Sequence, residues 1–468
     1  MLTNQRSSRS SVLAFFVVLA AMGVGIVAGF LAGAKPFYLV LAVVAVTAVV
    51  CLFTNFEFTV LGLLILRSSL DPFSAQQLPA AFALGVDALT LLYVTVLLLT
   101  KQRVQTNKFF WIFTLWVALQ GLWIVLPALG LGLGTSYLSF SIREWLRIFS
   151  WLMVYLLVMQ LDGRIHPQKV ISTLFLSLIV PLIVGFMQLL LPSRLPYFLA
   201  CSGCLNSTIG HPSAFGTFLF LFIGLTLWKL EQVRQRGLWI ILLATLAFFL
   251  VMTKSFTSLV IFCVFIVALT APKLNLLKLI GGVMFLSIVL GFFANTPFGQ
   301  EKLSAILDTP LFNPDTDISR TLMLAVGEGA NSANWRIAQW TYLFQAWQKS
   351  PLLGYGLGTS PYLTTTMFIG FYAHNDYMRF LTEQGIVGLF IVLSFFVAQF
   401  FYLFQLLRNS PPSSPKSQLC LTLIAILVGI VLGMPSDNVW SHTTLFFYWW
   451  LLFAVASWDW EQLEDENS

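Results

Sequence analysis

Residues 373–388 read AHNDYMRFLTEQGIVG and place an imidazole, amides, two carboxylates and a guanidinium directly before a long apolar run. The chain as a whole is 58% hydrophobic and only 9% charged, so such a polar stretch is expected where the chain enters a membrane. Histidine has an ordinary pKa of about 6.5, the closest to neutrality among side chains, so His374 could take a proton from a substrate hydroxyl. In the alternative interpretation, His374 and Asn375 only cap the helix that follows.

The rest of the chain is a series of apolar runs. About fourteen can be drawn, from residues 12–33 to residues 443–457. A bilayer core about 30 Å thick needs about 20 apolar residues per helix, so the sequence predicts an all-α polytopic membrane protein with about 12–14 transmembrane helices. Runs such as 58–70 and 258–271 are short enough to be tilted, re-entrant or fused with a neighbour. Run 12–33 is expected to be an uncleaved first helix.

The distribution of positive charge predicts the orientation. About fourteen Lys and Arg residues lie in one set of alternate short loops and about six in the other. By the positive-inside rule both termini are cytoplasmic and the long loop, residues 295–384, faces outward. We therefore expect one membrane domain, with N-terminal helices in 1–294, a periplasmic catalytic loop in 295–384, and C-terminal helices with a cytoplasmic tail in 385–468.

The long loop itself divides into two parts. Residues 297–334 are rich in Asn, Asp, Pro, Thr and Gly and are expected to be surface loop. Residues 335–349 carry apolar side chains at helical spacing and end before Ser350-Pro351. This pattern predicts a short amphipathic helix on the bilayer, with Ser332 or Asn334 as its N-cap.

Two motifs in this region resemble those of the O-antigen ligase and polymerase family of membrane glycosyltransferases. Residues 374–388 match its His-Asn-x9-Gly-x2-Gly signature. Upstream, Arg336 and Trp340 match its Arg-x3-Trp motif, and residues 350–358 match its Pro-Leu-x-Gly-x-Gly-x-Gly block. The detailed resemblance covers about sixty residues, from 330 to 390.

The resemblance implies a GT-C-like glycosyltransferase that needs no metal, cofactor or nucleotide sugar. Such an enzyme moves a glycan from undecaprenyl diphosphate to an acceptor hydroxyl, on lipid A-core or on another lipid-linked repeat, at the periplasmic face of the bacterial inner membrane. Its expected partners are the lipid-linked donor, the lipid or glycan acceptor and the bilayer, with no nucleic acid. The choice between ligase and polymerase stays open.

The reaction calls for one base and several cations. His374 is the predicted base, and Arg336 is predicted to bind the diphosphate with its planar guanidinium. Arg143 and Arg147 are four residues apart and share one helix face, where an anionic ligand would relieve their repulsion. Glu144 could instead pair with either arginine.

Further substrate contacts are predicted at five positions by the same resemblance: Gln339, Asn375, Gly356, Gly358 and Lys254. The glycines leave the backbone free to approach a ligand closely, or they form a flexible turn. Lys254 is the substitute for a Ser-Arg turn that is common in the family.

A second departure from the family lies in residues 201–212, where Cys204 stands near the place of an expected arginine. His211 is therefore expected to be structural. Cys201 and Cys204 lack the further ligands of a zinc site, so we expect a simple disulfide or no bond.

A transporter of a small anion such as bicarbonate is the alternative function. Transporters often show inverted repeats and charged residues near the bilayer midplane. Here the polar groups gather in one outer loop and no repeat is visible, which favours the enzyme. The sequence also lacks a Walker A motif and a Gly-x-Ser-x-Gly elbow, so neither nucleotide hydrolysis nor serine-hydrolase chemistry is supported.

Overall fold

The structure is a computed structural model that describes residues 36–201, 204–271 and 332–460, and residues 280–307 apart from 283, 285, 286, 289, 290 and 293. The predicted first span at 12–33, the acidic tail from residue 461 and most of the predicted surface loop lie outside the described residues.

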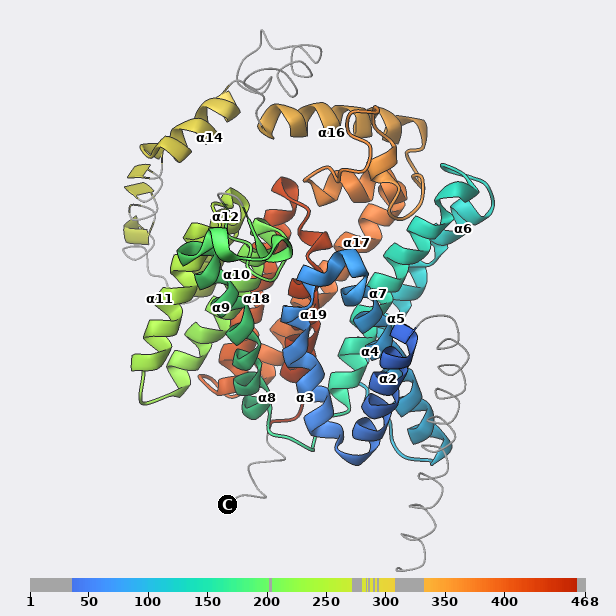
Figure 1. Ribbon diagram of the computed structural model, residues 1–468, viewed down its shortest axis with the longest axis vertical. Helices are drawn as coiled ribbons and strands as arrows, with labels where there is room; N and C mark the ends of the chain where they lie inside the picture. Colours follow the sequence, from blue (N-terminus) through green and yellow to red (C-terminus); the bar gives the residue numbers. More distant parts are fainter. Residues whose placement is uncertain are drawn as a thin grey trace, which may run out of the picture.

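All regular secondary structure in the described part of the chain is helical (Figure 1). The α-helices are α2 (Pro36–Thr54), α3 (Phe56–Leu66), α4 (Leu78–Leu99), α5 (Lys108–Gln120), α6 (Leu122–Ala128), α7 (Leu138–Met159), α8 (Pro167–Leu174), α9 (Ile179–Leu190), α10 (Pro212–Gln232), α11 (Gly237–Met252), α12 (Phe256–Thr270), α14 (Pro297–Leu307), α16 (Ser332–Lys349), α17 (Asp376–Asn409), α18 (Pro415–Gly433) and α19 (Thr443–Ala456).

The prediction of an all-α polytopic membrane protein is confirmed. Within the described residues, six helical segments are long and apolar enough to cross a membrane: α4, α5 with α6, α8 with α9, α10, α17 and α18. Four further apolar helices in the same part of the chain are shorter, with 10–17 residues. Run 58–70 corresponds to the short helix α3, which follows α2 directly after Asn55.

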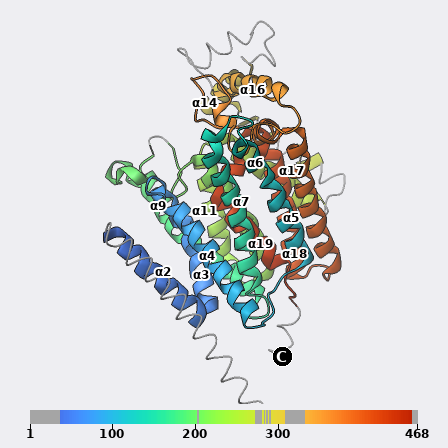
Figure 2. The same cartoon turned by 90° about the vertical axis from the view of Figure 1, so that its right-hand side faces the viewer.

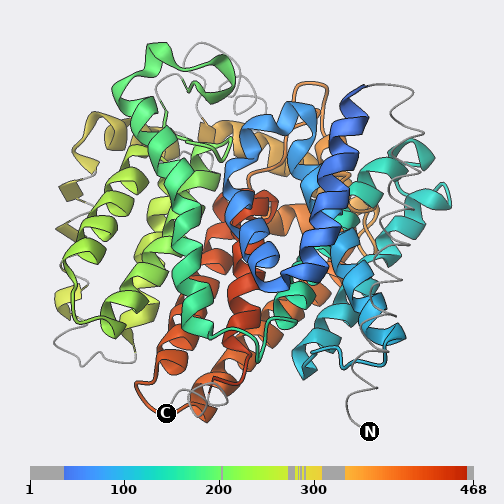
Figure 3. The same ribbon diagram turned by 60° about the horizontal axis from the view of Figure 1, so that its bottom comes forward.

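Helix α19 is the centre of the bundle. Its residues from Thr444 to Ala456 are all buried, and the helix packs against α7, α8, α10 and α18. In Figure 3 the red C-terminal helices lie between the green helices and the blue ones. Because other helices cover α19 on every side, this helix forms the core of the bundle.

Helix α16 and the segment that leads from it to α17 cover one end of this bundle. Helix α16 lies crosswise above the spanning helices and packs against α17 and α14 (Figures 1 and 2). The predicted amphipathic helix is therefore present and begins at Ser332. The expected surface loop is wrong at its start, because Pro297–Leu307 forms α14. The residue types that predicted a loop lie mostly after residue 307. Before α14, Oγ1 of Thr296 accepts a hydrogen bond from the Gly299 N–H and so caps the start of this helix.

Two glycines, Gly354 and Gly385, lie where the segment before α17 packs against that helix. Gly385 interrupts α17 with φ 64° and ψ −170°, a conformation reserved almost entirely for glycine. A Cβ atom there would lie 2.2 Å from the Leu352 carbonyl oxygen, and a Cβ atom on Gly354 would lie 2.5 Å from the Thr382 carbonyl oxygen. The glycine block of residues 350–358 thus lets one backbone lie directly on another at the point where α17 bends.

Candidate active site

His374 is held by a carboxylate from a distant part of the chain. It precedes α17 in the left-handed region, with φ 50°, and its side chain is 31% exposed. Its Nδ1 lies 3.0 Å from Oδ1 of Asp437, and its backbone N–H donates to Oδ1 of Asn438 at 2.8 Å. A proton on Nδ1 satisfies the carboxylate and leaves Nε2 free to accept another proton.

The side chains of Asn375 and Asp376, which follow His374, bind backbone N–H groups and not the His374 ring. Oδ1 of Asn375 accepts the N–H groups of Tyr377 and Met378 at 3.1 Å and so caps α17. Oδ2 of Asp376 accepts the Trp440 N–H at 2.8 Å. The helix cap in this motif is thus Asn375 and not His374, while a role of Asn375 in substrate binding stays a prediction.

Asp437 also faces two other histidines, so three of the four in the chain gather here. Burial raises the pKa of the Asp437 carboxyl, but the hydrogen bond from His374 and the nearby His442 outweigh burial and hold that pKa well below its usual range. Burial lowers the pKa of His442 to about 4, and its Nδ1 lies 2.9 Å from Oγ1 of Thr217. This histidine is therefore neutral at pH 7.

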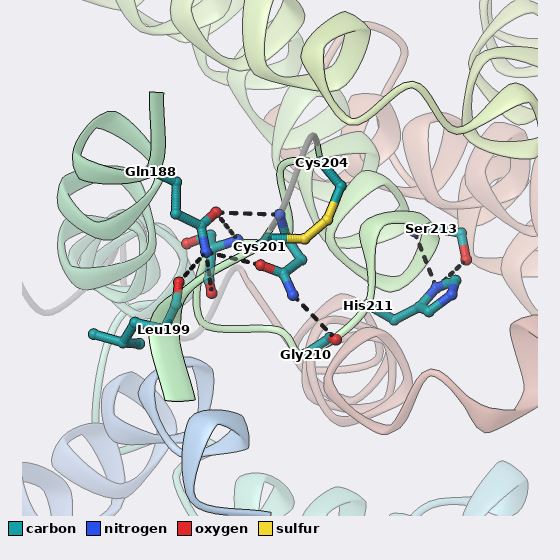
Figure 4. Close-up of a disulfide and its surroundings, with 9 residues drawn as sticks. Gln188, Leu199, Cys201, Cys204, Gly210, His211 and Ser213 are labelled. Carbon is teal, nitrogen blue, oxygen red and sulfur yellow. Dashed lines mark hydrogen bonds between the residues drawn. A yellow bond between two sulfur atoms is a disulfide. The ribbon is translucent and has the colours of Figure 1, made fainter. Parts of the chain in front are cut away.

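His211 lies at the start of α10, and its ring is fixed from one side. Its Nδ1 lies 2.8 Å from Oγ of Ser213 and also accepts the Ser213 N–H at 3.3 Å (Figure 4). Burial lowers the pKa of His211, although Asp437 partly opposes this. The structural role expected for His211 fits its position as the cap of α10.

Helix α16 brings the motif residues Arg336, Gln339 and Trp340 to the same place. Asp437 lies close enough to raise the pKa of Arg336, although burial lowers that pKa more. Nε2 of Gln339 donates to the Phe371 carbonyl at 2.7 Å, and Nε1 of Trp340 donates to the Ala373 carbonyl at 2.6 Å. Two side chains of α16 therefore fix the backbone that leads into His374.

A cavity of about 660 Å³ lies beside this cluster, between α4 and α7. Its wall includes Gly210, Tyr372 and Ser441, each of which lies one or two residues before one of the three clustered histidines in the sequence. The lining residues include three arginines (Arg67, Arg143 and Arg147), three acidic residues (Asp71, Asp87 and Glu144) and many apolar residues (among them Ala80, Ala83, Leu84, Val86, Val154 and Phe447). The cavity is amphipathic, as a site for a charged lipid must be.

The two predicted arginines of α7 differ in their surroundings. Arg143 is exposed and forms no ion pair with any residue that the structure describes. Arg147 pairs with Glu144 and donates to the Trp440 carbonyl. The alternative pairing with Glu144 is thus present for Arg147, which leaves Arg143 as the more available cation.

Arg379 was given no role by sequence reasoning, yet it is the centre of a buried ion network. Its side chain is 1% exposed and contacts Glu144 at 2.6 Å and Glu383 at 3.1 Å. Its Nη1 donates to Oγ of Ser441 at 2.9 Å. Glu383 also accepts the Gly358 N–H at 2.9 Å. The i,i+4 spacing of Arg379 and Glu383 was the available signal.

The remaining predicted contacts lie in different places. Gly358 lines the cavity, and Gly356 lies against α6, where a Cβ atom would be 3.3 Å from the Trp123 carbonyl oxygen. Lys254 is exposed between α11 and α12 and is not among the residues that line the cavity. Ligand contacts by these three residues stay predictions.

The loop before His211 is fixed by a disulfide between Cys201 and Cys204 (Figure 4). Nε2 of Gln188 donates to Oδ1 of Asn206 at 2.8 Å, and Nδ2 of Asn206 donates to the Gly210 carbonyl at 3.2 Å. No group of three His, Cys, Asp or Glu residues in the described part of the chain is arranged to hold a metal ion.

Comparison with known proteins agrees with these motifs. Residues 239–393 match the family model described as O-antigen ligase, and this range contains Arg336 and His374 but not Asp437. No curated protein matches the sequence significantly. The resemblance inferred from the motifs is thus confirmed over residues 239–393, which are similar to the O-antigen ligase family.

Proposed function

We propose that this protein is a metal-independent glycosyltransferase that moves a glycan from undecaprenyl diphosphate to an acceptor hydroxyl at the periplasmic face of the bacterial inner membrane. The acceptor is lipid A-core for a ligase, or another lipid-linked repeat for a polymerase. The observation that carries the proposal is the pair of His374 and Asp437 beside an amphipathic cavity. A base next to such a cavity suits a reaction between a hydroxyl and a lipid diphosphate.

His374 acts as the general base in this reaction. Its Nε2 accepts the proton of the acceptor hydroxyl while the oxygen attacks the anomeric carbon of the donor sugar. The bond between that carbon and the diphosphate oxygen breaks, and undecaprenyl diphosphate leaves with the electron pair. Asp437 stabilises the imidazolium at Nδ1 until the proton passes to water. Because diphosphate is a good leaving group, the base and the alignment of the substrates supply most of the catalysis.

The donor lipid is expected to occupy the cavity between α4 and α7. Arg143 and Arg147 would bind its diphosphate there, together with Arg336 on α16, because guanidinium groups bind phosphate oxygens in a bidentate geometry. The apolar wall around Leu84 and Val154 would contact the polyprenyl chain. This arrangement keeps the chain in the membrane and the sugar outside it.

Purified protein in lipid, supplied with lipid-linked donor and acceptor, tests the proposal. His374→Asn keeps hydrogen bonding but removes the base, so turnover should fall by about 10² to 10⁴-fold while donor binding persists. Arg336→Lys keeps the positive charge but loses the planar guanidinium that binds phosphate in a bidentate geometry, so transfer should fall severely. Transfer by His374→Asn at the wild-type rate would contradict the assigned base.

A wild-type protein that transfers no glycan but carries a small anion across proteoliposomes would instead support the transporter alternative. The lipid-linked intermediates of a deletion strain separate ligase from polymerase. A single repeat left on lipid A indicates a lost polymerase, whereas loss of only the capped lipid indicates a lost ligase.

A further inference from the structure

We propose that the Tyr372 hydroxyl is a further substrate contact, which donates a hydrogen bond to a diphosphate oxygen of the lipid-linked donor. This inference rests on the proposed function. Tyr372 lines the cavity and lies two residues before His374, so the same short segment supplies both a cavity-lining residue and the proposed base. Its hydroxyl has no hydrogen-bond partner in the described part of the chain, although the residue is half-buried.

The position of the Tyr372 ring is set by three neighbours. The guanidinium of Arg379 lies over the ring, 4.5 Å from its centroid. Gln339 and Trp340 hold the carbonyl groups of Phe371 and Ala373, which flank Tyr372 on both sides. A side chain whose ring is contacted and whose two neighbouring residues are held through their carbonyl groups can present its hydroxyl with little further ordering, which is what a preorganised donor requires.

The surroundings of Tyr372 keep its hydroxyl a hydrogen-bond donor. Arg379 lowers the pKa of the phenol, but burial and the carboxylates of Glu144 and Glu383 outweigh it, so the net shift is upward. The phenol therefore stays protonated at neutral pH and acts as a donor. Arg147 also acts on Tyr372 electrostatically, and Arg143 lines the same cavity, so an anion bound by the arginines would lie within reach of the hydroxyl.

Tyr372→Phe is the sharp test, because it keeps the ring and its contact with Arg379 and removes only the hydroxyl. In the purified transfer assay we expect kcat/KM for the donor to fall about 10- to 100-fold. The inhibition constant of inorganic diphosphate should rise by a comparable factor. Tyr137→Phe is the matched control, since Tyr137 contacts other rings but does not line the cavity, and it should stay within about twofold of wild type.

The results separate this inference from the proposed function. Wild-type transfer that is lost in His374→Asn but unchanged in Tyr372→Phe overturns the Tyr372 contact and leaves the proposed function intact. A rise in the acceptor KM alone, with an unchanged inhibition constant for diphosphate, also overturns it. Absence of transfer by the wild-type protein would contradict the proposed function itself. The thermal midpoint of Tyr372→Phe should match wild type, which shows that the change in rate is not a folding defect.

Discussion

The contact between Asp437 and His374 is the residue-scale feature on which the proposed chemistry depends. Asp437→Asn keeps the shape of the side chain, but its amide can donate to Nδ1 of His374 and so favours the tautomer with a proton on Nε2. With a proton already on Nε2, His374 cannot take the proton of the acceptor hydroxyl. We expect turnover to fall by about 10² to 10⁴-fold, measured in the purified transfer assay, with the donor KM little changed.

The structure offers a control for this prediction. Asn438 contacts the His374 backbone and not its ring, so Asn438→Asp should reduce turnover far less than Asp437→Asn. If Asp437→Asn transfers glycan within about threefold of wild type, the carboxylate does not set the His374 tautomer.

His442 makes the stability of this region depend on pH. Its folded pKa of about 4 lies below the ordinary value of 6.5, because the ring is buried and neutral. As pH falls below about 6.5, His442 binds a proton in the unfolded chain. In the folded protein it binds that proton only when the pH reaches about 4. The stabilisation is therefore complete above pH 6.5 and is lost between pH 6.5 and 4, by up to about 3 kcal/mol.

Thermal midpoints in detergent at pH 7.5 and pH 4.5 measure this effect. His442→Gln should be less stable than wild type at pH 7.5, because it loses the contact with Thr217, and should show a smaller drop between the two pH values. An equal drop in both proteins would assign the pH dependence to other groups.

At the scale of elements, the junction between the glycine block and α17 is the most sensitive point. Gly385→Ala places a Cβ atom 2.2 Å from the Leu352 carbonyl oxygen and forces alanine into a glycine conformation. Strain of this kind costs about 1–3 kcal/mol before the clash is counted. We expect a lower thermal midpoint and reduced transfer, because the same junction positions Glu383 under the Gly358 N–H.

Gly62→Ala is the matched control for the junction. Gly62 lies inside α3, and a Cβ atom there meets nothing within 4 Å. Alanine is favoured over glycine in a helix by about 1 kcal/mol, so this variant should be as stable as wild type or more stable. If Gly62→Ala lost as much stability as Gly385→Ala, the close backbone contact at Gly385 would not be the cause of the loss.

At the scale of the whole molecule, orientation in the membrane decides where the reaction takes place. Helix α16 and the loop between α17 and α18 lie at opposite ends of the bundle (Figure 1). Single cysteines at Gln345→Cys and Ser413→Cys, in a background with Cys51, Cys263 and Cys420 replaced by serine, report on the two ends. An impermeant maleimide added to intact cells should label position 345 and spare position 413 until the cells are opened. The reverse pattern would move the proposed reaction to the cytoplasm.

The sequence by itself determined the class of fold and the place of α16. The lengths of the apolar runs require membrane helices, because an apolar segment of about 20 residues is stable in lipid without any partner. The periodicity of residues 335–349 predicted α16, and the His-Asn motif directed attention to His374. These patterns are local in sequence, so they can be interpreted without knowing how the helices pack.

Only the tertiary structure decided how the site is held. Asp437 is 63 residues from His374 in sequence, and Arg379 and Glu144 are 235 residues apart, so neither pair follows from spacing. The contacts depend on how α17 packs against α18, whose C-terminal end leads to Asp437, and on how α7 packs against α19. The glycine block likewise proved to serve packing of one backbone on another at Gly354 and Gly385. Helix packing sets such long-range contacts, and a local pattern of residue types carries no information about which distant carboxylate will meet a given histidine.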